Sequence, residues 1–264
     1  MSDIALTLPN ARGPEMLRAT GTMISRSVRL SRRNVDALIT ALMLPIMLML
    51  LFVYLFGGAI NTGTRYVTYV VPGVILLCAG FGSSTTSVSV SLDMANGIID
   101  RFRSMDISPA AIVAGHVVAS VVRNVVSSAL VFGVALAIGY RPHASVAEWL
   151  AVIGILLLCM FAVSWLAAVF GLLATSAEGA NAFTFVVMFV PYASSAFVPI
   201  HTMAGWLQGF SRHQPCTPIT ESLRALLAGQ AAGSNAITAV TWCLGILAVS
   251  MIASVAAFRH RTRS

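Results

Sequence analysis

The sequence predicts an all-α polytopic membrane protein with six transmembrane helices. Of its 264 residues, 58% are hydrophobic and only 9% are charged, whereas typical soluble domains have roughly 25% charged residues. A bilayer core is about 30 Å thick and is crossed by about 20 helical residues. Six charge-poor windows of that order occur along the chain, and too few polar residues remain to cover a water-exposed globule. We therefore expect a single transmembrane domain over residues 1–264.

Ahead of the first span, residues 14–34 are expected to form an amphipathic interfacial helix. Leucine, isoleucine and valine side chains recur there on one stripe at helical spacing. Arginines that would meet anionic headgroups occupy the other faces, among them Arg26, Arg29 and Arg33. A basic flank that serves only to orient the first span is the open alternative.

The six spans are expected at about 37–60, 66–92, 116–140, 149–174, 181–199 and 236–258. The third contains Arg123, and a charge at mid-membrane costs roughly 2.5–3.5 kcal/mol on insertion scales. We therefore expect Arg123 near the inner end of its span or facing a protein interior.

Arginine placement predicts the orientation. Eleven of the sixteen basic residues fall on the side of both termini, and four fall opposite. Because cytoplasmic loops carry the excess of positive charge, we expect a multi-pass protein of the inner (plasma) membrane with both termini in the cytoplasm. Since the arginines flank membrane segments, we expect them to contact bilayer lipids, and we expect no nucleic-acid partner.

Between the last two spans, residues 200–230 are expected to form an outer hairpin of two short helices that dips partway into the bilayer. Thr217 and Pro218 suit an N-cap and a first helical position, Glu221 suits the first turn, and Gly229 suits the stop. The alternative is an ordinary outer loop with an amphipathic segment.

Several kinds of chemistry are excluded by missing residues. No lysine occurs anywhere in the chain, so a phosphate-binding P-loop cannot be present. The sequence contains neither a metal-binding motif nor a nucleophile elbow, and the four cysteines stand singly. No carboxylate falls near the middle of an expected span, which argues against an ion-coupled carrier. The many small residues inside the spans indicate helix packing or a substrate path.

The segment 93–107 between spans two and three concentrates charge in an otherwise apolar chain. Met94, Ile98, Phe102 and Met105 recur at i, i+4, i+8 and i+11, on one helical face. We expect a short cytoplasmic amphipathic helix. Its apolar face would rest on the membrane or insert into a groove of a partner protein.

Two separated motifs resemble those of a known family. The first is the run GIIDRFRSM from Gly97 to Met105, followed by Ile107 and Ser108. The second lies in the outer segment and comprises Phe197, Val198, Pro199, Met203, Trp206, Leu207, Gln208, Phe210, Pro215, Thr217, Pro218 and the run from Leu223 to Leu226. In these motifs and in the order of its elements, the chain resembles ABC type-2 exporter permeases, and the daunorubicin-resistance branch in particular.

The resemblance implies a permease that works with a second permease chain, identical or paralogous, and with two ATPase subunits. This chain would bind no cofactor, since ATP and Mg would be held by the ATPase. The helix seated in the ATPase groove would contain Asp93, Gly97, Asp100, Arg101, Phe102, Arg103, Ser104, Met105 and Asp106. The hairpin would cap the substrate exit as an outer gate formed by Phe197, Pro199, Trp206, Leu207, Pro215 and Arg224.

Two positions depart from the family pattern, because Asp106 and Ala204 stand where many relatives have proline. Arg101 and Arg103 would pair with acidic groups of the ATPase or serve only as positive-inside charges. The expected function is the permease subunit of an ATP-binding-cassette exporter that moves hydrophobic drugs or lipid-like compounds outward, as in multidrug efflux and antibiotic resistance. The chain is not expected to be an enzyme itself. An ion-coupled efflux carrier and an integral membrane lipid enzyme are the alternatives.

Overall fold

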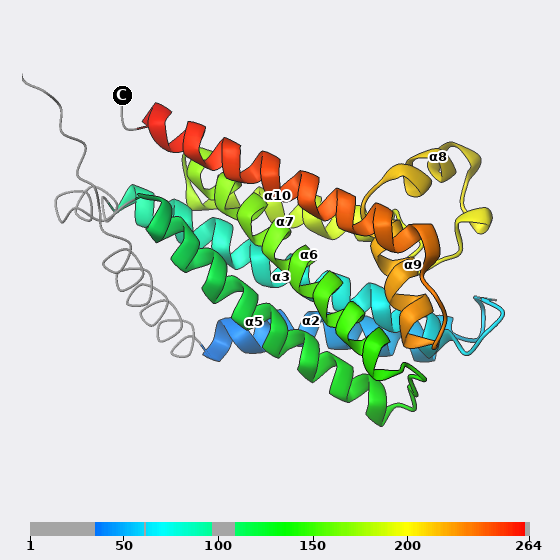
Figure 1. Cartoon of the computed structure of the whole chain (residues 1–264). Helices are drawn as coiled ribbons and strands as arrows, with labels where there is room; N and C mark the ends of the chain where they lie inside the picture. Colours follow the sequence, from blue (N-terminus) through cyan, green and yellow to red (C-terminus); the bar gives the residue numbers. More distant parts are fainter. Residues whose placement is uncertain (1–34, 61, 97–108, 262–264) are drawn as a thin grey trace, which may run out of the picture.

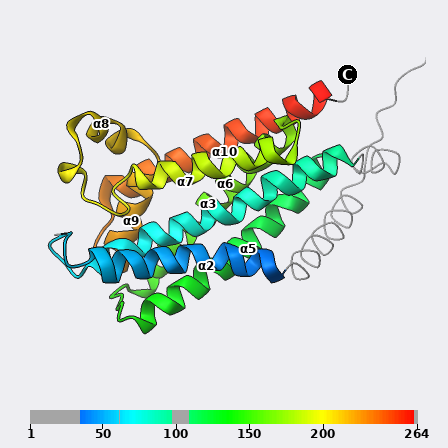
Figure 2. The same ribbon diagram turned by 180° about the vertical axis from the view of Figure 1, so that it is seen from behind.

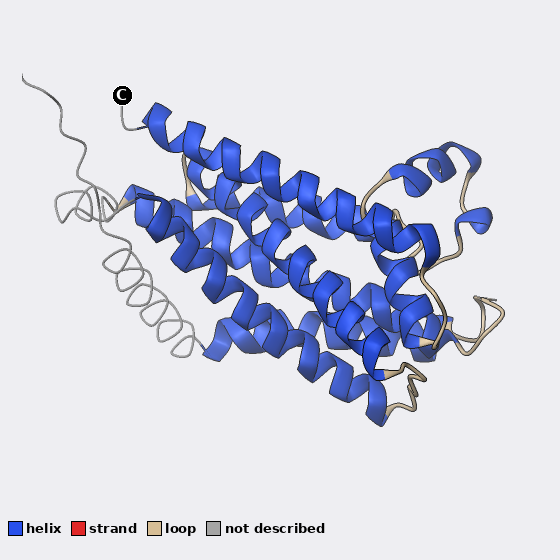
Figure 3. Cartoon of the chain, in the orientation of Figure 1, coloured by secondary structure: helices blue, strands red, loops and turns tan. Residues whose placement is uncertain are grey.

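The computed structural model describes residues 35–60, 62–96 and 109–261, and every regular element in these ranges is helical (Figure 3). The helices are α2 (Val35–Leu51), α3 (Tyr66–Ala95), α5 (Pro109–Ala137), α6 (Val146–Leu173), α7 (Ala177–Tyr192), α8 (Gly205–His213), α9 (Cys216–Leu227) and α10 (Gly233–Arg261). A π-helical segment, Phe52–Phe56, continues α2, and a 3-10 turn, Ile200–Thr202, precedes α8. The all-α prediction is confirmed over the described residues. The expected interfacial helix at 14–34 lies outside them.

Four helices of the described ranges are long and apolar enough to cross a membrane. Their apolar stretches are Tyr66–Ala95, Val113–Ala137, Val146–Leu173 and Gly233–Ala257. These match the second, third, fourth and sixth expected spans. The apolar stretch Met43–Phe56 is shorter, and α7 has 16 residues, so the first and fifth spans stay predictions.

The helix α7 ends earlier than the expected span 181–199, because the chain turns after Tyr192. The Ser194 hydroxyl donates a hydrogen bond of 2.5 Å to the carbonyl of Pro191 and accepts one of 3.0 Å from the amide of Ala196. Serine side chains that bond to nearby backbone groups offer the chain an alternative to a further helical turn. The segment from Ala193 to Pro199 is therefore not helical.

The helix α3 lies in the middle of the bundle and contacts α2, α5, α6, α7 and α9 (Figures 1 and 2). Its neighbours approach closely at glycines. A Cβ added at Gly171 of α6 would lie 2.4 Å from the carbonyl oxygen of Ser87, and one at Gly80 would lie 2.3 Å from Val187 Cγ1. At these positions the small residues serve helix packing, which was one of the two open interpretations.

Replacing Gly171 with alanine is expected to lower the free energy of unfolding by about 1–3 kcal/mol, because α6 must move away from the backbone of α3. Gly154 lies on the same helix with open space around it, so Gly154→Ala provides a matched control. The melting temperatures of the two purified variants are measured by thermal unfolding in the same detergent and compared. Equal melting temperatures would show that the close approach of α3 and α6 contributes nothing to stability.

A polar seam joins α3, α5 and α6 inside the bundle. Ser164 bonds to Ser83 and Ser120 at 3.2 and 2.9 Å, and Asn124 Nδ2 donates to the Ser83 hydroxyl at 3.1 Å. Next to it, Arg123 Nη2 donates to the hydroxyls of two threonines of α3. The prediction that Arg123 faces a protein interior is confirmed by these contacts.

The two ends of the bundle differ. We call the end that carries α8 and α9 the hairpin end, and the end where α3 stops and α5 begins the loop end. Figure 1 places them at opposite ends of the long helices, with α10 reaching the loop end at its C-terminus. Segments that were predicted on opposite sides of the membrane thus lie at opposite ends of the bundle.

Candidate functional site at the hairpin end

The helix α9 begins at Cys216, two residues before the expected first position Pro218, so Thr217 is not its N-cap and Glu221 does not lie in its first turn. The side chain of Gln214 accepts a hydrogen bond of 3.0 Å from the Cys216 amide instead. Thr217 is drawn inward because its hydroxyl donates to the carbonyl of Ser211 at 2.6 Å and accepts from the amide of Ser195 at 3.3 Å. At the other end, Gly229 follows the last turn with a φ of 73°, which confirms it as the stop.

Thr217 therefore ties α8, α9 and the segment after α7 together. Replacing it with valine keeps the shape but removes these hydrogen bonds in a buried place, and we expect a loss of about 1–3 kcal/mol of stability. Thr241→Val is the matched control, since the Thr241 hydroxyl is exposed and bonds only to the carbonyl of Ile237 in its own helix. Thermal unfolding measures both variants, and a control that loses as much as Thr217→Val would contradict the prediction.

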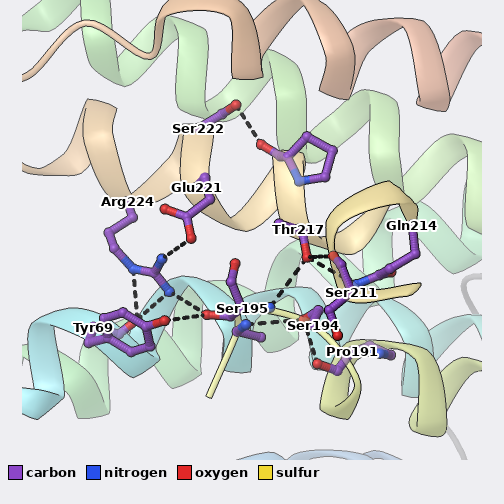
Figure 4. A network of polar contacts seen from close by, with 12 residues as sticks. Tyr69, Pro191, Ser194, Ser195, Ser211, Gln214, Thr217, Glu221, Ser222 and Arg224 are labelled. Atoms are coloured by element: carbon purple, nitrogen blue, oxygen red, sulfur yellow. Dashed lines mark hydrogen bonds and ion pairs between the residues drawn. The ribbon is translucent and has the colours of Figure 1, made fainter. Parts of the chain in front are cut away.

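Arg224 of α9 is the centre of a polar network at this end (Figure 4). Its guanidinium donates to the carbonyl of Tyr69 at 3.1 Å and to that of Ser195 at 2.9 Å. It pairs with Glu221 at 2.8 Å and lies 3.7 Å from the centroid of the Tyr69 ring. One arginine thereby joins α9 to α3 and to the segment that follows α7.

The segment after α7 is also held by tyrosines and aromatic stacking. The Tyr66 hydroxyl donates to the carbonyl of Phe197 at 2.8 Å, and the Tyr69 hydroxyl donates to that of Ser195 at 2.9 Å. The ring of Phe197 is buried and stacks on Phe52 at 4.8 Å and on Tyr192 at 4.9 Å. Phe197 thus fixes this segment between the ends of the surrounding helices.

A cavity of about 730 Å³ opens beside this network. Its lining combines apolar, polar and oppositely charged residues, and consists of Thr62, Gly63, Thr64, Tyr69, Pro199, Ile200, His201, Arg212, Glu221 and Arg224. Among the described residues, no group of three His, Cys, Asp or Glu side chains is placed to hold a metal ion. The site is suited to non-covalent passage or binding of a molecule at the hairpin end.

The structure brings only some of the predicted outer-gate residues together. Pro199 and Arg224 line the cavity and Phe197 supports it. Trp206 and Leu207 belong to α8, where Trp206 is 83% exposed, and Pro215 immediately precedes α9. Sequence reasoning missed Tyr69 and Ser195. A buried tyrosine requires a hydrogen-bond partner, so the tyrosine pair near the start of the second span was the available signal.

At the loop end, Asp93 is the one predicted coupling residue within the described ranges. Its Oδ2 lies 3.0 Å from Nε2 of His116. This contact joins the end of α3 to the first turns of α5 across the undescribed residues 97–108. The described ranges do not include the other predicted coupling residues, which are Gly97, Asp100, Arg101, Phe102, Arg103, Ser104, Met105 and Asp106. They also do not include the arginines of the expected interfacial helix, Arg26, Arg29 and Arg33.

Long apolar helices around a polar seam, with a cavity lined partly by charged side chains at one end, are typical of a membrane transport subunit. The chain belongs to the ABC-2 type transporter family, whose family model matches residues 18–228. It is a permease subunit of an ABC exporter, and the ATPase is a separate subunit.

Relatives of this family are similar along nearly the whole chain. The daunorubicin resistance ABC transporter permease protein DrrB1 of Streptomyces coeruleorubidus is 29% identical over 249 residues, which cover 92% of this chain and 84% of the relative. The probable doxorubicin resistance ABC transporter permease protein DrrC of Mycobacterium tuberculosis, strains CDC 1551 / Oshkosh and H37Rv, is 22% identical over 260 residues. These cover 96% of this chain and 93% of the relative.

Proposed function

We propose that this permease moves hydrophobic drugs or lipid-like compounds out of the cell, driven by two copies of a separate ATPase. The observation that carries this proposal is the similarity, over 92% and 96% of the chain, to permeases named for daunorubicin and doxorubicin resistance. The largely apolar membrane helices suit a substrate that is itself amphiphilic and enters from the bilayer.

Six membrane spans with both termini in the cytoplasm are the proposed topology. The helical stretch from Val35 to Phe56 is long enough, at 1.5 Å per residue, to cover about 30 Å and would be the first span. The helix α7 together with the turn that follows it would be the fifth. The excess of arginine in the N-terminal segment, in the segment that joins α3 to α5 and at the C-terminus of the sequence supports placing the loop end in the cytoplasm and the hairpin end outside.

Coupling to the ATPase is assigned to residues 93–107. When ATP binding draws the ATPase subunits together, this segment would carry their movement into the membrane helices. The Asp93–His116 contact supports this role, because a displacement of the loop would act on α3 and α5 together. Rigid-body movement of this kind requires a mechanical joint and no catalytic residue.

The helix α3 would carry the movement onward to the exit. It bears Asp93 near the loop end and Tyr69 near the hairpin end, and Tyr69 is bonded to Arg224 of α9. Opening of the exit would release the bonds of Arg224 to α3 and to the segment after α7. Each complex would contain a second permease chain, identical or paralogous, that provides the other half of the path.

The proposal is tested by export from living cells. Cells that express this permease alone, its ATPase alone, or both are loaded with a lipophilic dye, and the loss of dye is followed by fluorescence. Energy-dependent loss is expected only with both proteins, and an ATPase without its catalytic glutamate should abolish it. Dye export by the permease alone, driven by a proton gradient, would instead establish an ion-coupled carrier.

A further inference from the structure

Arg123 is a charged side chain inside a membrane-spanning helix. It lies in α5, about 15 Å along the apolar stretch from Val113. Its Nη2 donates to the hydroxyl of Thr86 at 2.9 Å and to that of Thr85 at 3.2 Å, while its buried Nε has no hydrogen-bond partner among the described residues. Neutral hydroxyls satisfy part of the guanidinium but do not compensate its charge.

Four carboxylates have side chains that the structure describes, namely Asp93, Glu148, Glu178 and Glu221, and none of the four lies within ion-pair distance of Arg123. Asp93 contacts His116, and Glu221 pairs with Arg224. Glu148 accepts hydrogen bonds from Ser145 at the start of α6. Three of these carboxylates are therefore already engaged with other polar groups.

The surroundings of Arg123 suit an amphiphile. Its side chain is only partly buried, and the same helix exposes an apolar surface around it, made of Val122, Val125, Val126 and Leu130. A guanidinium with free donors binds phosphate or carboxylate oxygens strongly in a low-dielectric setting. If the polar head of an amphiphile lay beside Arg123, the apolar tail of that amphiphile would lie along the valine and leucine side chains of α5.

We propose that Arg123, with the hydroxyls of Thr85 and Thr86, binds the anionic phosphate or carboxylate head of an amphiphile that lies against α5. This inference rests on the proposed function and narrows its substrate class to anionic amphiphiles. Two carboxylates would be competitors for the site. Asp36 belongs to α2, which contacts α5, and Glu178 is exposed at the start of α7.

Native mass spectrometry of the purified permease tests the proposal. The protein is mixed with phosphatidic acid and phosphatidylcholine of identical acyl chains at equal concentrations, and the lipid retained on the protein is identified. We expect retention of phosphatidic acid over phosphatidylcholine by about tenfold, and loss of this preference in Arg123→Gln. Arg141→Gln is the matched control, because Arg141 donates to the carbonyls of Leu136 and Tyr140 near the other end of α5.

Four outcomes would contradict the proposal. A wild-type permease without preference overturns it, and so does a preference that survives Arg123→Gln. If Asp36→Asn or Glu178→Gln creates a preference that the wild type lacks, that carboxylate occupies Arg123 instead. Excess inorganic phosphate is expected not to displace the lipid, since the site requires a tail. Complete displacement would mark a site for free anions and overturn the assignment to an amphiphile.

This experiment needs no ATPase, so its failure is distinguishable from failure of the proposed function. A permease that exports nothing but retains phosphatidic acid through Arg123 has the anion site without the proposed transport. Export assays then address the substrate class directly. In cells with both proteins, Arg123→Gln is expected to raise the KM for an anionic lipophilic dye by about tenfold and to leave export of a cationic dye unchanged. Equal effects on both dyes would contradict the assignment.

Discussion

Simultaneous replacement of Asp100, Arg101 and Arg103 by alanine is expected to reduce ATP-driven export by at least about a hundredfold and to release the ATPase from the purified complex. Charged hydrogen bonds at an interface contribute roughly 1.5–3 kcal/mol each. Because about 1.4 kcal/mol corresponds to a tenfold change in affinity, the loss of two such bonds weakens binding of the ATPase by about a hundredfold or more. Co-purification of the ATPase with the tagged permease and dye export from the same cells measure the two effects.

A matched control separates coupling from membrane orientation. Arg259 and Arg263 are also expected on the cytoplasmic side but lie outside the segment 93–107. Their double replacement by alanine is expected to leave the ATPase bound and export intact. If the triple variant behaves like this control, Arg101 and Arg103 serve only as positive-inside charges and the coupling assignment is wrong.

Replacing Arg224 with alanine is expected to cost about 3 kcal/mol of stability and to impair export even where the protein stays folded. The substitution leaves the carbonyls of Tyr69 and Ser195 without their charged donor and leaves Glu221 without its partner. Arg224→Lys should give an intermediate loss, because an ammonium cannot reproduce the planar fork of a guanidinium.

The control for Arg224 is Arg212→Ala, which removes an exposed arginine from the same cavity. Thermal unfolding in detergent and dye export are measured for the three variants. We expect a lower melting temperature for Arg224→Ala than for Arg212→Ala. Equal melting temperatures would mean that the network in Figure 4 does not hold the hairpin to the bundle.

Local patterns in the sequence predicted much of the fold. Apolar runs located the helices that become α3, α5, α6 and α10, because the length of such a run follows from the thickness of the bilayer. Gly229 was recognised as a helix stop because its residue type suits a left-handed backbone. The placement of Arg123 followed from the cost of exposing a charge to lipid.

Contacts between distant segments were not predictable in this way. Tyr69 and Arg224 are 155 positions apart, and no periodicity connects them. Threonine is a residue type that suits an N-cap, but the Thr217 hydroxyl bonds to the carbonyl of Ser211 instead of capping α9. The early end of α7 depends on how the Ser194 side chain bonds to the backbone, which residue type alone does not specify. The site at the hairpin end is therefore a product of packing, whereas the helices that frame it are visible in the sequence.

Transport by purified components tests the central claim most directly, namely that this chain is a permease driven by a separate ATPase. The permease is reconstituted into liposomes with its ATPase, with an ATPase that cannot hydrolyse ATP, or alone, and movement of a lipophilic dye is followed after addition of ATP or of a proton gradient. We predict ATP-dependent movement with the active ATPase only. Dye movement by the permease alone under a proton gradient, or ATP-dependent movement with the inactive ATPase, would contradict it.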